Sequence, residues 1–214
     1  MRQKFREYAK VYQKMLLDDV IPFWENHSID KKHGGYFTCL TREGDVFDSD
    51  KFIWLQARQM WLFSILYNRI EKKEGWLTIA QHAMAFLKKN GRDNAGNWYF
   101  SLNQKGEPLI QPYNIFSDCF AAMAFSQYAI ATGDKEAREI ARFTYRNILK
   151  RKDNPKGKYN KTVPDTRPMK NFALPMILCN LSLELEDIIP AEEVEKTIDD
   201  CVFEVIDRKS TRLN

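Results

Sequence analysis

The sequence predicts an all-α protein: an incomplete (α/α)6 barrel, or toroid, of helical hairpins with short β-hairpins in the loops. Two observations predict it: an internal repeat and an alternation of two kinds of helix. Residues 34–45 (GGYFTCLTREGD) align without a gap on residues 96–107 (GNWYFSLNQKGE), at an offset of 62 residues. A third segment begins at Gly157, 61 residues after Gly96, and matches weakly. A period of this size is typical of stacked supersecondary units that cannot bury their faces alone.

The individual elements follow from local patterns. Each repeated segment is predicted to be a β-hairpin, because aromatic and β-branched residues lead into a polar turn that ends in glycine. Apolar residues at helical spacing predict seven helices, over residues 2–20, 51–70, 76–89, 115–131, 134–149, 168–185 and 191–206. Pro22 follows near the end of the first helix. Asp134, after Gly133, is a good N-cap for the fifth.

Two kinds of helix alternate along the chain. Residues 76–89 and 134–149 are amphipathic, with lysines and arginines suited to a solvated face. Residues 115–131 and 172–183 are apolar nearly all round, and a helix without a polar face is buried on all sides. The alternation therefore predicts two concentric helix layers.

The number of helices predicts an open arc. A closed ring takes six helix pairs, or about 370 residues at this period. The chain supplies three pairs and one extra helix, so we expect residues 1–207 to be the N-terminal part of a single barrel domain in a longer protein. Residues 208–214 have neither helical pattern nor cap, and we expect an artefactual or disordered tail there.

Composition excludes several classes of protein. The 214 residues include 14 Phe, 9 Tyr and 5 Trp, too many for a disordered chain. The net charge is only +4, which does not favour a nucleic-acid partner. No apolar run is long enough to span a membrane, and the N-terminus is not a secretory signal. The four cysteines form no CxxC pair and lie at no zinc-ligand spacing from the histidines, so we expect reduced thiols in a cytoplasmic protein and no metal site.

Two stretches carry motifs of a known family. The first is HGGYFTCLTREG at residues 33–44, followed by KFIWLQARQMW at 51–61; the second is IFSDCF at 115–120, with RPMKNFALPM at 167–176. These strings resemble the N-acylglucosamine 2-epimerase family, which includes cellobiose 2-epimerases and aldose–ketose isomerases. The string WLQxRQxW resembles the N-acylglucosamine branch more than the cellobiose branch. The resemblance reaches about residue 206 and implies an (α/α)6 barrel.

The resemblance implies a sugar 2-epimerase that interconverts N-acylglucosamine and N-acylmannosamine. A proton leaves C2 of the opened sugar, beside the C1 aldehyde, and returns on the opposite face, so the reaction needs a base, an acid and a group that holds the enolate oxygen. Arg58 matches the family arginine that lies against the reacting end of the sugar, and a planar cation suits an enediolate. The alternative for Arg58 is a structural ion pair.

The two catalytic histidines of the family lie in its later half, one of them in a His-x-x-Glu segment. Nothing in this chain matches that segment, so we expect these histidines beyond Asn214 and the chain alone to be inactive. For His27, His33 and His82 we expect structural or surface roles.

Four further residues are candidates for binding the sugar. Tyr113 precedes an inner helix where family members offer an aromatic hydroxyl, although capping and packing compete with that role. Asn171 corresponds to a pocket position on the third inner helix. Trp54 and Trp61 could stack on a sugar face, but large aromatic residues at helical spacing are also typical of a core.

The basic loop at residues 150–164 is the one charge cluster. Lys158 is followed by Tyr159, so the loop is not a P-loop. Relatives in the N-acylglucosamine branch are activated by nucleotides such as ATP without consuming them, and Lys158, Lys161 and Thr162 could hold phosphates there. The alternative is a merely solvated loop. No cofactor is expected to be required.

Two rival functions remain open at this point. One is an α/α-barrel glycoside hydrolase, which needs two carboxylates, and Asp118 is the only plausible acid on an inner helix. The other is a helical-repeat protein-interaction module. The predicted partner is a small-molecule sugar, N-acetylglucosamine or N-acetylmannosamine, with no nucleic acid or membrane, and we expect a homodimer when the protein is full length.

Overall fold

The computed structural model describes residues 2–112, 114–153 and 172–210, without the side chains of residues 208–210. Its helices, in chain order, are α1 (Arg2–Met15), the π-helical turn η1 (Leu16–Val20), α2 (Ile21–His27), α3 (Ile53–Arg69), α4 (Glu74–Asn90), α5 (Phe116–Thr132), α6 (Lys135–Arg151), α7 (Ala173–Glu184) and α8 (Ala191–Ser210). Its strands are β1 (Cys39–Leu40), β2 (Val46–Asp48), β3 (Lys51–Phe52), β4 (Ser101–Leu102) and β5 (Pro108–Ile110).

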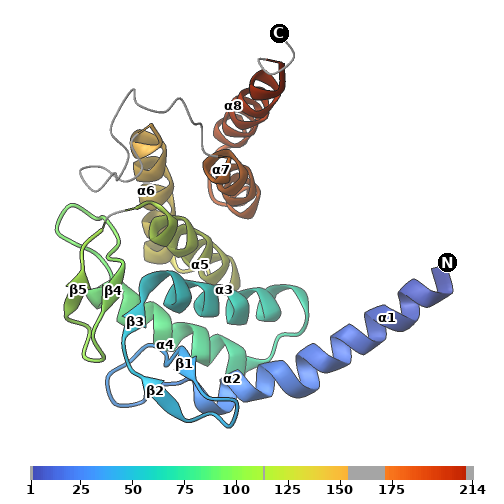
Figure 1. Ribbon diagram of the computed structural model, residues 1–214, viewed down its shortest axis with the longest axis vertical. Helices are drawn as coiled ribbons and strands as arrows, with labels where there is room; N and C mark the ends of the chain where they lie inside the picture. Colours follow the sequence, from blue (N-terminus) through green and yellow to red (C-terminus); the bar gives the residue numbers. More distant parts are fainter. Residues whose placement is uncertain (1, 113, 154–171, 211–214) are drawn as a thin grey trace.

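The helices form two rows (Figure 1). In the inner row, α5 packs against α3 and α7. In the outer row, α4 packs on α3, α6 on α5 and α8 on α7. Helix α5 is buried from Ser117 to Ala129 except at Phe120, whereas α6 buries a single stripe that includes Ala137 and Tyr145. Helices α5 and α6 confirm the predicted contrast between a buried and a half-solvated helix. Helix α7, which we expected to be buried on all sides, buries only Pro175, Leu178, Leu181 and Ser182 and leaves Met176 and Leu183 exposed.

The repeat corresponds to two equivalent hairpins. Strand β1 pairs with β2 and strand β4 pairs with β5, and the pairs Leu40↔Val46 and Leu102↔Pro108 occupy matching positions 62 residues apart. The glycines that end the two turns both have a positive φ, 96° at Gly44 and 93° at Gly106. The third repeat segment, from Gly157, lies outside the described residues.

Buried polar contacts tie the first hairpin to α3. The Gln56 side chain accepts a hydrogen bond from the Tyr36 backbone N–H and donates one to the Tyr36 carbonyl, both at 2.7 Å. Lys51, which is fully buried, pairs with Asp30 at 2.9 Å and also donates to the Gly34 carbonyl. Burial alone would raise the pKa of Asp30. The hydrogen bonds that its carboxylate accepts from Lys51 and from the His33 N–H outweigh burial, so the pKa of Asp30 is lowered.

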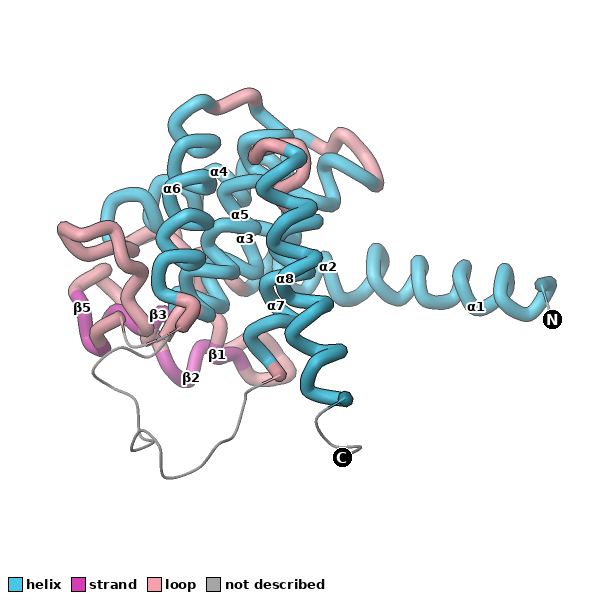
Figure 2. The backbone as a smooth tube through the Cα atoms, turned by 90° about the horizontal axis from the view of Figure 1, so that it is seen from above, coloured by secondary structure: helices cyan, strands magenta, loops and turns pink. Residues whose placement is uncertain are grey.

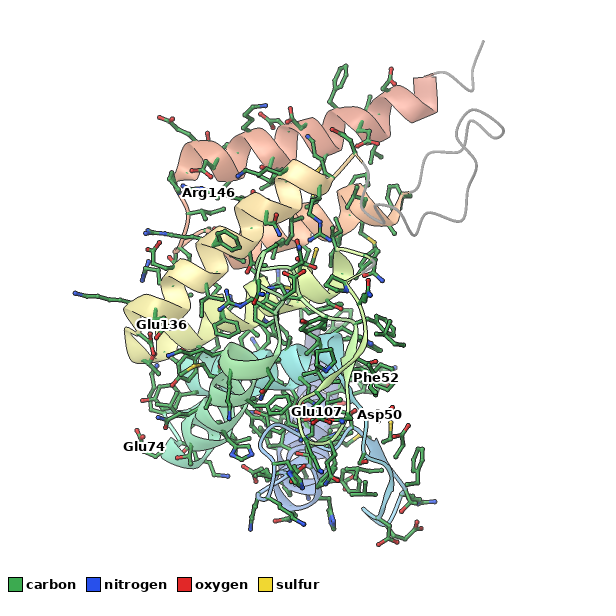
Figure 3. The ribbon with its side chains drawn as sticks, turned by 90° about the vertical axis from the view of Figure 1, so that its left-hand side faces the viewer. Asp50, Phe52, Glu74, Glu107, Glu136 and Arg146 are labelled. Carbon is green, nitrogen blue, oxygen red and sulfur yellow. The ribbon has the colours of Figure 1, made fainter. Side chains whose placement is uncertain are left out.

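The hairpins and the charged outer helices lie on opposite sides of the molecule. Figure 3 shows Phe52 and Glu107, in or beside the three-stranded sheet β3–β4–β5, to the right of the middle of the view. Glu74, Glu136 and Arg146, on α4 and α6, lie on the left. The hairpins thus gather beside the N-terminal ends of the inner helices α3 and α5.

The structure corrects three predicted boundaries. The first helix does not end near Pro22: a π-helical turn, with the Ile21 N–H bonded to the Leu16 carbonyl, lets α2 begin at Ile21 with the proline in its first turn, where no N–H is needed. Lys51 and Phe52 are strand, because they pair with β4. Helix α8 continues to Ser210, past the residue at which we expected the tail to begin.

The N-terminal helix has no buried residue. Its apolar residues at helical spacing are exposed: Phe5, Tyr8, Val11, Tyr12, Met15 and Leu16. Figures 1 and 2 both show α1 projecting from the rest of the chain. The helical spacing therefore predicts the helix correctly, although no other described element covers its apolar face.

Candidate functional site

Arg58 lies on the inner helix α3 with its side chain exposed. Its guanidinium carbon lies 5.0 Å from the Phe120 ring centroid and 5.7 Å from the Trp54 ring centroid. Among the described residues no carboxylate forms an ion pair with it; the seven pairs that they contain involve other cations. Arg58 is therefore held over aromatic faces with its N–H donors available to a ligand.

A cavity of about 290 Å³ opens beside Arg58. Its wall is mostly aromatic and aliphatic, with few polar side chains. The lining residues are Trp24, Thr38, Leu55, Arg58, Gln59, Trp61 and Leu62. Three separate parts of the chain contribute: α2, the segment before β1, and α3. An apolar cavity with a few polar groups is typical of a small-molecule site, and we call it the Arg58 pocket.

Of the two tryptophans predicted as sugar-binding residues, only Trp61 lines the Arg58 pocket. Its indole Nε1–H donates to Glu184 on α7 at 3.0 Å, which fixes the ring between two inner helices. Trp54 packs beside Phe120 at 6.4 Å between ring centroids and stacks with the Arg58 guanidinium. Trp54 thus supports Arg58, whereas Trp61 forms part of the wall.

The remaining predicted site residues lie outside the described residues. They are Tyr113, Asn171, Lys158, Lys161 and Thr162. Their roles stay predictions.

The three histidines do not line the Arg58 pocket. The His82 Nε2 bonds to the Asp30 carbonyl at 3.1 Å, and the His27 ring packs on Phe23 at 5.0 Å. His33 bonds through its backbone N–H to Asp30. These placements suit structural roles in the first hairpin.

Asp118 does not line the Arg58 pocket and pairs instead with a residue of α6. Its Oδ1 accepts a hydrogen bond from Arg151 at 2.9 Å, and its side chain is fully buried. Burial raises the pKa of Asp118 to about 6, although the Arg151 charge opposes the rise. Among the residues that the structure describes, no aspartate or glutamate lines the Arg58 pocket, so these residues supply no pair of carboxylates for glycoside hydrolysis.

Sequence reasoning missed five residues of the wall: Leu55, Gln59 and Leu62 on α3 itself, and Trp24 and Thr38 from other segments. Trp24 follows Pro22, where we expected the helix to have ended, and Thr38 belongs to a hairpin that we interpreted as a repeat and a family motif, without assigning any of its residues to the site. The sequence contains no signal for Trp24 and Thr38, because only tertiary contacts bring their segments close to the string WLQxRQxW. Gln59 belongs to that string, and its amide donates to Ser28.

Two further features are absent from the described ranges. Residues 2–112, 114–153 and 172–210 contain no group of three His, Cys, Asp or Glu side chains able to hold a metal ion. Within the same ranges no helix combines the length and the apolar composition needed to cross a bilayer. The four cysteines are free thiols, as the sequence predicts.

Comparison with known proteins identifies the relatives of the chain. The family model described as N-acylglucosamine 2-epimerase (GlcNAc 2-epimerase) matches residues 35–214. N-acylglucosamine 2-epimerase of Rattus norvegicus is 35% identical over 191 residues, which is 86% of this chain and 46% of the relative. Cellobiose 2-epimerase of Bacteroides fragilis is 33% identical over 127 residues, or 58% of this chain and 32% of the relative. The chain thus spans about half the length, or less, of these curated relatives.

The fold has a solved counterpart. Cellobiose 2-epimerase from Spirochaeta thermophila superposes with a TM-score of 0.78 at 21% identity, covering 94% of this chain and 54% of that one. Such a likeness shows the (α/α)6-barrel fold, of which these residues form part. The match of the family model over most of the length shows that the chain belongs to the N-acylglucosamine 2-epimerase family.

Proposed function

We propose that the whole protein is a sugar 2-epimerase that interconverts N-acylglucosamine and N-acylmannosamine, and that Arg58 holds the reacting end of the open-chain sugar. One observation carries the proposal: a guanidinium without a carboxylate partner among the described residues stands at the edge of a largely apolar pocket in a chain of this family. The choice of sugar rests on the string WLQxRQxW and on the match to the rat N-acylglucosamine 2-epimerase, which covers more of this chain than the match to the Bacteroides fragilis cellobiose 2-epimerase does.

The chemistry requires a cation where Arg58 lies. When a base removes the C2 proton, the electrons of the C–H bond form the C1–C2 double bond and the carbonyl electrons move to the C1 oxygen, which becomes an enolate. A fixed guanidinium beside that oxygen stabilises the developing charge more than it stabilises the neutral aldehyde. Return of a proton to the opposite face of C2 restores the aldehyde with inverted configuration.

The proposal assigns the remaining roles from the family resemblance. The groups that transfer the proton are two histidines, which in family members lie in the C-terminal half of the sequence. No cofactor is required, and a nucleotide such as ATP, held by Lys158, Lys161 and Thr162, acts as an allosteric activator. The complete protein works as a cytoplasmic homodimer without a nucleic-acid or membrane partner.

Sugar binding by the complete protein tests the pocket. We expect N-acetylmannosamine to raise the melting temperature of the complete protein, and we expect Arg58→Ala to abolish the rise. Arg58→Lys should retain a smaller rise, because lysine keeps the charge but loses the fork. Arg69→Ala is the matched control, since Arg69 is an exposed arginine on the same helix and does not line the pocket.

Isotope exchange tests the reaction itself. The complete protein in D₂O should place deuterium at C2 of both sugars, and Arg58→Ala should lower the exchange rate by about 100-fold or more, as loss of an oxyanion donor does. Absence of C2 exchange would contradict the epimerase proposal. Release of a reducing sugar from an oligosaccharide would favour the hydrolase, and binding of a protein without any sugar shift would favour the interaction module.

A further inference from the structure

The side chain of Thr38 carries a buried hydroxyl that makes no hydrogen bond. Three side-chain atoms within the described part of the chain are buried in this way: Thr38 Oγ1, Asn68 Oδ1 and Asp118 Oδ2. Of their three residues, Thr38 alone lines the Arg58 pocket. A buried hydroxyl without a partner is unfavourable, so its presence in a pocket wall calls for an explanation.

The backbone around Thr38 cannot move to relieve the unpaired hydroxyl. Gln56 clamps the N–H and carbonyl of Tyr36, the Phe37 N–H donates to the Ser28 carbonyl at 2.6 Å, and Cys39 pairs with Asp48 in the first hairpin. The Thr38 Cα is therefore fixed on both sides. Rotation about χ1 is the freedom that remains: a turn of about 120° carries the hydroxyl to the place of the methyl group, which in turn moves to the place of the Cβ hydrogen.

The other polar side chains of the pocket have defined tasks. The Gln59 amide donates to Ser28, and Arg58 is a permanent cation suited to a developing negative charge. Thr38 is neutral, and its hydroxyl both donates and accepts. Trp24 and Trp61 supply apolar faces against which a sugar ring can lie.

We propose that Thr38 is a sugar-binding residue: on binding, its hydroxyl pairs with a neutral hydroxyl group of the sugar, away from the carbon that reacts. The inference rests on the proposed function, because it takes the ligand of the Arg58 pocket to be a polyhydroxylated sugar. It makes Thr38 a specificity-determining residue, since a pocket group left unpaired by the wrong ligand discriminates more strongly than an apolar contact does.

Replacing Thr38 with valine should stabilise the free protein and weaken its binding of the sugar. Thr38→Val keeps the shape and removes the unpaired hydroxyl, so the melting temperature of the free protein should rise by about 2–4 °C. The same variant should bind N-acetylmannosamine about 3- to 10-fold more weakly, because one hydrogen bond to the sugar is lost. Thr38→Ser, which keeps the hydroxyl, should bind like the wild type.

Thr144→Val is the matched control. The Thr144 hydroxyl is buried like that of Thr38, but it accepts a hydrogen bond from the Trp98 indole at 3.1 Å. The same substitution there should lower the melting temperature and leave the affinity for the sugar unchanged. A panel of monodeoxy sugars then identifies the hydroxyl group that pairs with Thr38. The analogue that lacks this group should bind the wild type more weakly than the parent sugar does. To Thr38→Val, the analogue and the parent sugar should bind with equal affinity.

The outcomes separate the inference from the function on which it rests. If the wild type binds the sugar and Thr38→Val binds it equally well, the role of Thr38 is wrong while the pocket stands. A fall in melting temperature for Thr38→Val, like that of Thr144→Val, would show that the hydroxyl is paired in the free protein and would also overturn the inference. If the wild type binds no sugar, the proposed function fails, and the role of Thr38 fails with it.

Discussion

Replacing Asp118 with asparagine should remove a pH dependence from the stability of the protein. Asp118 lies in the first turn of α5, fully buried, and pairs with Arg151 at the end of α6. Burial raises its pKa from 3.8 to about 6, because the loss of hydration outweighs the attraction of Arg151. The difference corresponds to about 3 kcal/mol of free energy of unfolding.

The sign follows from proton binding. Between pH 4 and pH 6 the folded carboxyl holds its proton while the unfolded carboxyl has lost it, so the folded state binds more protons. Asp118 therefore favours folding below pH 4, and this contribution is lost as the pH rises through about 6. At pH 7 the wild type carries the full penalty of a buried charge.

Urea denaturation followed by circular dichroism at pH 4, 5, 6 and 7 measures the effect. The free energy of unfolding of the wild type minus that of Asp118→Asn should fall by about 2 kcal/mol across this range, because the unfolded carboxyl is already more than half ionised at pH 4. Other titrating groups cancel in the difference. Arg151→Gln, which removes the cation, should move the transition above pH 6. A difference that stays flat from pH 4 to pH 7 would refute the argument that burial dominates at Asp118.

Two further substitutions test how the first hairpin is held. Gln56→Leu leaves two backbone groups of Tyr36 unpaired and should lower the free energy of unfolding, measured by urea denaturation, by about 3 kcal/mol. Gln56→Glu keeps only the acceptor, so its free energy of unfolding should lie between those of Gln56→Leu and the wild type. Gly44→Ala places a Cβ 2.1 Å from the His27 ring at a φ of +96°, whereas Gly133→Ala meets nothing within 4 Å at +73°. Gly133→Ala should therefore lose only about 1–2 kcal/mol, from its left-handed backbone, and Gly44→Ala clearly more; equal losses in the same assay would contradict the predicted clash.

Local patterns in the sequence were sufficient for most of the elements. The spacing of apolar residues predicted α3 to α8, and the repeat predicted the two hairpins with their glycine turns. Such features depend on neighbours within a few residues, so a single chain contains the information. The same holds for the Asp134 cap, whose side chain accepts a hydrogen bond from the Ala137 N–H at 2.9 Å.

Local patterns could not predict the features that depend on contacts between residues far apart in the sequence. Lys51 looks like a surface residue in the sequence, yet it is fully buried because Asp30 and the Gly34 carbonyl, far along the chain, meet its ammonium group. Pro22 looks like a helix end, but the π-helical turn before it lets the helix continue.

The sequence by itself determined the helical class, the repeat, the family motifs and the place of Arg58 in one of those motifs. Only the tertiary structure decided which side chains share a pocket with Arg58, because Trp24 and Thr38 reach α3 through folding of separate segments. The physical reason is that periodicity specifies which face of an element is buried, whereas a pocket depends on which elements meet across that face.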